Sequence, residues 1–347
     1  MSLRPRGLTL SKVFDILENI IHTTITQERK EATVAPSTII LIAAISLVGL
    51  TFLFLLALYW IARIAFIRSG KDTDAFDGFD APAMAPFKEE STERITRLLN
   101  EEYEDVYITS TKGGLRLHGR LYFRHGGAPF QVMAHGYRSN PYRDFSGGAL
   151  EALDGGYNLL LIDQRAHLES EGKIISFGIY EKYDLIDWTE YIADRFPGCD
   201  IIPIGISMGG ATVVQASMLT MPSAVKCLIA DCPYAEVRDI LIHTARKMGF
   251  PAAVYPLIRL SARIFCGFDP EDSRATEAAR AARVPILIIH GDSDGMVPEE
   301  YSARLSDANP NLIERHLFAG ANHGISYLVD RDKYMNTVAD FIRRHTG

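Results

Sequence analysis

Cysteine is scarce in this chain, since its 347 residues include only Cys199, Cys227, Cys232 and Cys266. Four scattered cysteines lack the paired spacing of a disulfide-bonded scaffold or a zinc knuckle, and we interpret them as buried thiols. The chain also lacks an excess of positive charge, because its formal net charge is −7. We therefore do not expect nucleic acid as a partner. Internal repeats are missing too, and glycine and proline occur without periodicity, which excludes a fibrous repeat.

Charge is missing altogether between Ala32 and Ala62. About 20 apolar residues cross a hydrocarbon core roughly 30 Å thick, so the centre of this run, residues 38–62, is predicted to form one transmembrane helix. Tyr59 and Trp60 lie near its end, where amphipathic rings favour the membrane interface. A buried core helix and a cleaved signal peptide are the alternatives. The run is longer, and begins later, than the apolar part of a signal peptide.

The flanks of this segment leave its orientation open. Basic residues lie on both sides of it: Arg29, Lys30, Arg63, Arg68 and Lys71. The positive-inside rule therefore does not decide which side carries the rest of the chain. Residues 1–37 form either an amphipathic helix on the membrane surface or a polar tail. Residues 63–91 mix glycine, proline and aspartate and are predicted to be a tether. On this prediction, removal of residues 1–70 leaves a soluble and active domain.

Residues 92–347 are predicted to form one domain in which short apolar runs alternate with helical stretches. The apolar runs are 104–110, 115–123, 130–134, 157–162, 200–206, 225–230, 285–290 and 312–318. The first two flank Lys112-Gly113-Gly114 and indicate an antiparallel hairpin. The others predict a mostly parallel sheet covered by helices on both faces. Ligands of such sheets bind beyond the carboxyl ends of the strands.

Ser207 lies in the segment GISMGG, directly after the fifth apolar run and before a helical stretch. G-x-S-x-G between a strand and a helix is the pattern of a nucleophile elbow, in which small residues permit a tight turn. An ordinary glycine-rich turn is the alternative. The segment lacks the lysine of a phosphate-binding loop, and the chain has no His/Asp/Glu cluster with metal-ligand spacing. We therefore expect neither a cofactor nor a metal.

Two further runs end in residues that complete a catalytic set. Asp292 and Asp294 follow the run 285–290, and His323 lies in a glycine-flanked loop after the last run. The order serine, aspartate, histidine is that of an α/β-hydrolase triad. His323 is predicted to accept the serine proton, while an aspartate holds its tautomer. Asp231, after the sixth run, is a third candidate for that acid.

With these motifs, residues 104–346 resemble the α/β-hydrolase superfamily, in particular membrane-anchored bacterial serine hydrolases grouped with serine aminopeptidases and esterases. The matching segments are AHGY (134–137), DQRAHLES (163–170), GISMGG (205–210), HGDSDGMVP (290–298) and GANHG (320–324). The resemblance implies an α/β-hydrolase fold. It also implies that Asp294 is the acid and that the backbone N–H groups of Tyr137 and Met208 form the oxyanion hole.

Two positions depart from the family pattern. Ala166 and Leu168 stand where relatives usually carry glycine, so the shape of this loop is expected to differ. His167 between them is not a triad member in the family, and we predict a structural role for it.

Residues 234–283 are long for a connection between two strands and carry apolar residues at helical spacing. In the superfamily an insertion at this place commonly forms a cap over the pocket. An ordinary crossover helix with surface helices is the alternative. An apolar cap suits a hydrophobic acyl or aryl group.

The sequence thus predicts a membrane-tethered serine hydrolase that cleaves an ester, a thioester or a small amide through an acyl-enzyme. An esterase is favoured over a peptidase. Use of the same site for acyl transfer or for aminopeptidase-like cleavage is the alternative, and a non-catalytic binding module on this fold is a further one. The expected partners are a hydrophobic small-molecule acyl substrate and the lipid bilayer.

Overall fold

The computed structural model describes residues 15, 18–23, 35–70 and 74–346 of the chain. The chain divides into two compact units, Met1–Ala57 and Leu58–Gly347. Helix α2 runs from Pro36 to Ala65, so that its end from Leu58 onward belongs to the second unit. Among the described residues, α2 is the helix that is long and apolar enough to span a membrane. Most of the predicted N-terminal segment 1–37 lies outside the described residues.

The second unit contains one eight-stranded sheet in the order β1-β2-β4-β3-β5-β6-β7-β8. The strands are β1 (Glu104–Thr109), β2 (Arg116–Tyr122), β3 (Phe130–Ala134), β4 (Asn158–Ile162), β5 (Ile201–Ile206), β6 (Leu228–Asp231), β7 (Ile286–Gly291) and β8 (Ile313–Phe318). Strand β2 pairs antiparallel with β1 and β4, and every other neighbouring pair is parallel. Each strand overlaps one of the predicted apolar runs.

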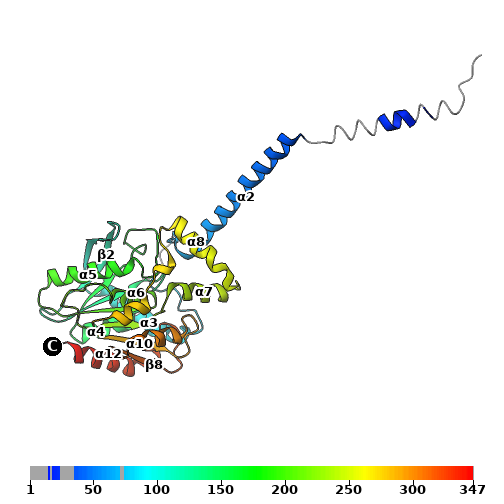
Figure 1. Cartoon of the computed structure of the whole chain (residues 1–347). Helices are drawn as coiled ribbons and strands as arrows, with labels where there is room; N and C mark the ends of the chain where they lie inside the picture. The colour runs from blue at the N-terminus through cyan, green and yellow to red at the C-terminus, as the bar shows by residue number, and fades with distance from the viewer. Residues whose placement is uncertain (1–14, 16–17, 24–34, 71–73, 347) are drawn as a thin grey trace, which may run out of the picture. The chain divides into compact units, whose positions relative to one another are not determined.

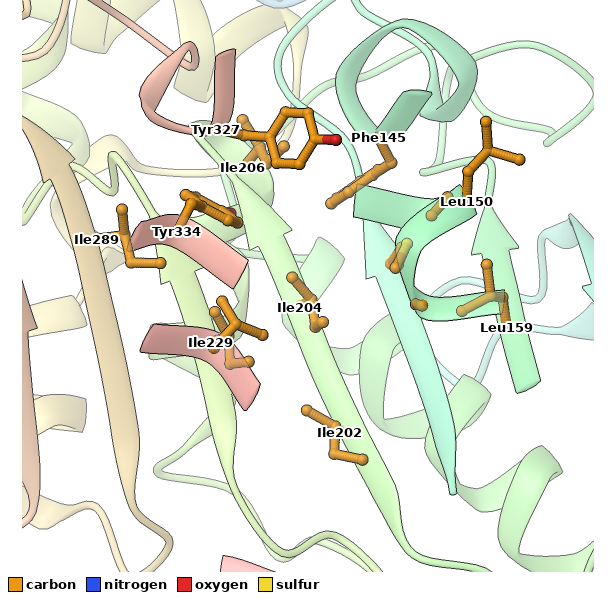
Figure 2. Packing of buried hydrophobic residues seen from close by; sticks show 14 of the residues in the cluster. Phe145, Leu150, Leu159, Ile202, Ile204, Ile206, Ile229, Ile289, Tyr327 and Tyr334 are labelled. Carbon is orange, nitrogen blue, oxygen red and sulfur yellow. The ribbon is translucent and has the colours of Figure 1, made fainter. Parts of the chain in front are cut away.

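Helices cover both faces of this sheet (Figure 1). They are α3 (Lys88–Asn100), α4 (Pro141–Asp154), α5 (Glu181–Arg195), α6 (Met208–Ala216), α7 (Val237–Lys247), α8 (Tyr255–Phe265), α9 (Ala275–Ala281), α10 (Glu299–Ala308), α11 (Ser326–Val329) and α12 (Arg331–His345). Successive strand residues point to opposite faces, so a strand buried on both faces is apolar throughout. In β5, Ile202 and Ile204 pack with α4 and α12 (Figure 2), whereas Ile201 packs with α5 and α6.

Apolar side chains form one packed cluster on each face of the sheet, and a third cluster lies at the carboxyl edge of the sheet. It combines α7 and α8 with Phe177 and Met208, with Ala62 near the end of α2, and with Phe66 just after α2. The insertion 234–283 therefore has two parts. Helices α7 and α8 share this cluster with the residue that follows Ser207. Helix α9 packs instead in the helix layer beside α6 and α10.

The domain begins earlier than the sequence predicts. Residues 63–91, predicted to be a tether, contribute the fully buried Phe66 and Phe79, and α3 starts at Lys88. The composition is that of a linker, but these isolated aromatic side chains are removed from water against the domain, which stabilises the packed segment. The boundary lies at Leu58 rather than at residue 92.

Candidate active site

Ser207 occupies a sharp turn between β5 and α6. Its φ of 56° and ψ of −114° lie in a region that L-residues rarely adopt, so the turn holds the backbone under strain. Two glycines make the turn possible. A Cβ on Gly209 would lie 1.8 Å from the carbonyl oxygen of Ala134, and one on Gly205 would lie 2.2 Å from the Gly209 carbonyl group. Only glycine fits these two positions, as the elbow motif predicts.

His323 lies in the loop that follows β8, with its ring against Ser207. Its Nε2 is 2.9 Å from Ser207 Oγ, and its Nδ1 is 2.7 Å from Asp294 Oδ2. Nδ1–H donates to the carboxylate, which leaves Nε2 to accept the serine hydroxyl proton. The neighbouring Asn322 Oδ1 accepts the backbone N–H groups of His323 and Gly295, and so joins the two loops.

Asp294 follows β7 and has a fully buried side chain. Its Oδ1 accepts the backbone N–H groups of Met296 and Val297, both at 2.8 Å. Burial raises the pKa of Asp294, but the hydrogen bonds from His290 and His323 outweigh burial, and the pKa lies well below its ordinary value. The carboxylate therefore stays ionised and oriented toward His323.

His290 is a contact of the acid that the sequence analysis did not single out. Its Nε2 lies 3.2 Å from Asp294 Oδ2 and 3.0 Å from the carbonyl oxygen of Val297. Both partners are acceptors, so Nε2 carries the proton. The available signal was the position of His290 at the start of HGDSDGMVP, four residues before Asp294.

The other two candidate acids lie elsewhere. Asp292 Oδ1 accepts the backbone N–H of Gly320 and the hydroxyl of Ser293. Asp231 is buried, and burial raises its pKa to about 6 although a hydrogen bond with Tyr334 lowers it. Of the three, the structure brings Asp294 to His323.

The two residues predicted to supply the oxyanion donors, Met208 and Tyr137, come from segments next to Ser207. Met208 is the first residue of α6, where backbone N–H groups have no partner within the helix. Tyr137 follows Gly136, whose Cβ position is 3.4 Å from Ser207 Cβ. Asp144 Oδ2 accepts the Gly136 N–H at 2.7 Å and holds this loop. No motif marks Asp144, and sequence reasoning missed it.

The loop that departs from the family pattern packs against the same region. Ala166 and Leu168 both have positive φ, 61° and 43°, so they adopt the conformation that glycine favours. His167 between them is buried, and burial lowers its pKa to about 3. Its Nδ1–H donates to the carbonyl of Arg165, and its Nε2 accepts the backbone N–H of Arg138. The neutral ring thus supports the residue next to Tyr137.

Within the described residues, Cys232, Asp294 and His323 have ligand atoms within 4.8 Å of one another. Burial raises the pKa of Cys232 well above its ordinary value, so the thiol stays protonated at neutral pH. Both ring nitrogens of His323 are already used by Ser207 and Asp294. This group of side chains is a poor fit for a metal ion, which needs a thiolate and a free imidazole nitrogen.

Comparison with known proteins points to one fold. A family model described as alpha/beta hydrolase fold matches residues 132–271. The uncharacterized protein YqkD of Bacillus subtilis is 27% identical over 193 residues, which cover 55% of this chain and 63% of that protein. Thiohydrolase aneE of Aspergillus aculeatus is 33% identical over 167 residues, 46% of this chain and 49% of the thiohydrolase. The chain thus matches about half to two thirds of these relatives' lengths.

Among solved structures, esterase Pf2001 of Pyrococcus furiosus superposes with a TM-score of 0.60 and 24% identity, over 72% of this chain and 94% of the esterase. An eight-stranded sheet with a serine on the turn after β5, an aspartate after β7 and a histidine after β8 defines the α/β-hydrolase fold. The chain has the α/β-hydrolase fold, which confirms the predicted fold class, and the family match over residues 132–271 agrees with the predicted resemblance to the α/β-hydrolase superfamily.

Proposed function

We propose that the protein is a membrane-tethered serine hydrolase that cleaves an ester or thioester of a hydrophobic acyl group. The observation that carries the proposal is the hydrogen-bonded chain from Ser207 Oγ through His323 to Asp294. The serine sits at the carboxyl edge of a parallel sheet, on a strained turn, with a buried carboxylate two hydrogen bonds away. The esterase and thiohydrolase among the similar proteins support ester and thioester chemistry.

The reaction follows from the positions of these groups. His323 Nε2 takes the proton as Ser207 Oγ bonds to the carbonyl carbon, and Asp294 stabilises the imidazolium. The N–H groups of Tyr137 and Met208 hold the oxyanion, a contact worth about 3 kcal/mol for one donor in other enzymes. The carbon–oxygen or carbon–sulfur bond then breaks, and His323 protonates the leaving alcohol or thiol. Water repeats the sequence on the acyl-enzyme and releases the acid.

Covalent labelling with a fluorophosphonate tests the nucleophile. The wild type is expected to be labelled, and Ser207→Ala is expected to abolish labelling while the fold remains. The matched control is Ser293→Ala, because Ser293 lies in the loop beside the acid and bonds to Asp292. Labelling that survives Ser207→Ala, or is lost in the control alone, overturns the assignment of Ser207.

The apolar helix α2 supports membrane attachment, and carbonate extraction of cell membranes tests it. The double substitution Leu47→Arg and Leu50→Arg places charges at the centre of α2, where both side chains are exposed. Each arginine is unfavourable by about 2.5–3.5 kcal/mol at the centre of a membrane helix. The wild type should stay in the carbonate-resistant pellet and the variant should leave it. The control is Leu47→Ile with Leu50→Ile, which preserves hydrophobicity.

A further inference from the structure

The end of α2 is bound by the residue predicted to supply an oxyanion donor and by the next residue in the chain. The last carbonyl groups of a helix have no partner within it. The Tyr137 hydroxyl donates to the carbonyl oxygen of Ala65 at 2.9 Å. The Arg138 guanidinium donates through Nη2 to the carbonyl oxygens of Ile64 at 2.9 Å and Ile67 at 3.0 Å. A cation is also the charge that the C-terminus of a helix favours.

Aromatic packing adds to these hydrogen bonds. The ring of Tyr137 stacks on Phe177, with ring centroids 4.9 Å apart. Phe66, which follows α2 and is fully buried, meets Phe177 edge-on at 5.9 Å and Phe268 edge-on at 5.2 Å. Such pairs contribute beyond the area that they bury. Tyr137 therefore lies between the helix end and the apolar cluster at the sheet edge.

The chain beyond α2 binds a second loop, which supports Arg138, the residue next to Tyr137. Arg68 Nη2 donates to the carbonyl oxygen of Leu168 at 2.6 Å, and Ile175 N–H donates to the carbonyl oxygen of Phe66 at 2.8 Å. In the same loop His167 accepts the N–H of Arg138. Arg138 has a φ of 50°, a strained conformation that persists where surrounding contacts impose it. Residues 63–68 therefore connect both loops.

We propose that residues 63–68, at the end of the apolar helix, position the oxyanion hole. The Tyr137 hydroxyl and the Arg138 guanidinium act as positioning groups, because they fix the peptide whose N–H is aimed at the oxyanion. Preorganised donors matter most where charge develops in the transition state. The helix end is thus a part of the active site and more than an attachment to the catalytic domain. This inference rests on the proposed hydrolase function and on Tyr137 as a donor.

Substitutions that spare the backbone N–H test this inference in the full chain in detergent micelles. With p-nitrophenyl butyrate as substrate, Tyr137→Phe is expected to lower kcat by about 5- to 20-fold, the effect of one lost hydrogen bond or two. KM should stay within twofold. Arg138→Ala is expected to lower kcat further, and Arg138→Lys should restore part of it. The inhibition constant of a trifluoromethyl ketone, which forms an oxyanion, should rise in parallel with the loss of kcat.

Tyr180→Phe is the matched control. The Tyr180 hydroxyl also donates to a backbone carbonyl, that of Gly267, at 2.7 Å, and its ring packs against the same apolar cluster. This variant should lose similar stability with no change in kcat or in ketone inhibition. Tyr137→Phe removes only one oxygen atom, so we expect this variant to fold. It therefore tests the positioning role even if Arg138→Ala does not fold.

The outcomes separate this inference from the function on which it rests. A wild type that fluorophosphonate does not label, and that leaves the ester intact, refutes the hydrolase proposal. A labelled wild type whose Tyr137→Phe and Arg138→Ala variants keep kcat and ketone inhibition within twofold refutes the positioning role alone. A rise in KM at constant kcat also refutes it, because that result assigns the residues to substrate binding.

Discussion

Asp294 and Asp292 are two residues apart in the sequence, but they differ in every contact that matters for catalysis. Asp294 is buried and receives hydrogen bonds from His323 and from two backbone N–H groups. Asp292 lies on the exposed side of the same loop and holds the turn at Gly320. A side chain that only shapes a loop is not expected to affect the tautomer of His323.

We expect Asp294→Asn to lower kcat by about 10⁴, as loss of the correct histidine tautomer does in serine proteases. Asp292→Asn, the matched control, should stay within a few-fold of the wild type. Initial rates on p-nitrophenyl butyrate check both. The reverse ranking would assign the acid to Asp292.

Asp231 gives a prediction about stability and pH. Burial raises its pKa from 3.8 to about 6, while contacts with Tyr334 and the charges of His290 and His323 lower it. Between about pH 4 and pH 6, the carboxyl group of Asp231 is protonated in the folded state and ionised in the unfolded state. This group therefore lowers the free energy of unfolding as the pH rises from about 4 to about 6. Above about pH 6, a further rise in pH causes no further loss of stability through Asp231.

Asp231→Asn removes the charge and keeps the shape. It should raise the free energy of unfolding at pH 8 by up to about 3 kcal/mol, from 1.36 kcal/mol for each unit of pKa, and leave it nearly unchanged at pH 4. Urea unfolding at pH 4, 6 and 8 measures this. An equal effect at pH 4 and pH 8 contradicts the prediction. Because Asp231 makes no hydrogen bond with His323, the kcat of the variant should equal that of the wild type.

At the scale of elements, α7 and α8 pack close to the residue that follows Ser207. They share an apolar cluster with Met208, which contributes a predicted oxyanion donor. We propose that this cluster borders the acyl site, where each buried methylene contributes about 0.8 kcal/mol, or about fourfold in affinity.

We expect kcat/KM for p-nitrophenyl esters to rise from acetate toward butyrate or hexanoate until the apolar site is full. Ile240→Asn should flatten this dependence, because Ile240 of α7 lies in the cluster. Tyr191→Asn, in α5 and packed against a different apolar cluster, is the control. A profile that peaks at acetate, or faster cleavage of aminoacyl anilides, favours the aminopeptidase-like alternative.

At the scale of the whole molecule, the position of the domain boundary decides which truncations keep the fold. The unit begins at Leu58, and Leu58, Ala62 and Phe66 are fully buried in it. Arg68 adds hydrogen bonds to the loop near His167. A cut at residue 70 removes all of these groups, although the sequence alone predicts an intact domain.

A chain that starts at Leu58 should unfold at a higher temperature than one that starts at residue 71. Loss of a buried phenylalanine side chain alone costs about 3–5 kcal/mol. Thermal unfolding of the two proteins, purified in the same detergent, measures the difference. Equal unfolding temperatures would show that residues 58–70 add nothing to the domain. Phe66→Ala in the longer protein should reproduce part of the loss.

Local patterns were enough to predict the order of the strands along the chain, the turn at Ser207 and the apolar helix. Each depends on neighbouring residues: near-continuous apolar runs, glycines on either side of a serine, and a charge-free run of helical length. The predicted runs overlap all eight strands, and the family match agrees with the predicted fold class.

Contacts between distant segments were decided by the tertiary structure. The Tyr137 hydroxyl and the Ala65 carbonyl group are 72 positions apart, and Arg68 and Leu168 are 100 apart. Residues 63–91 have the composition of a linker, and no local periodicity marks Phe66 as buried. Burial depends on which surfaces the fold brings together, and that information is not carried by neighbouring residues.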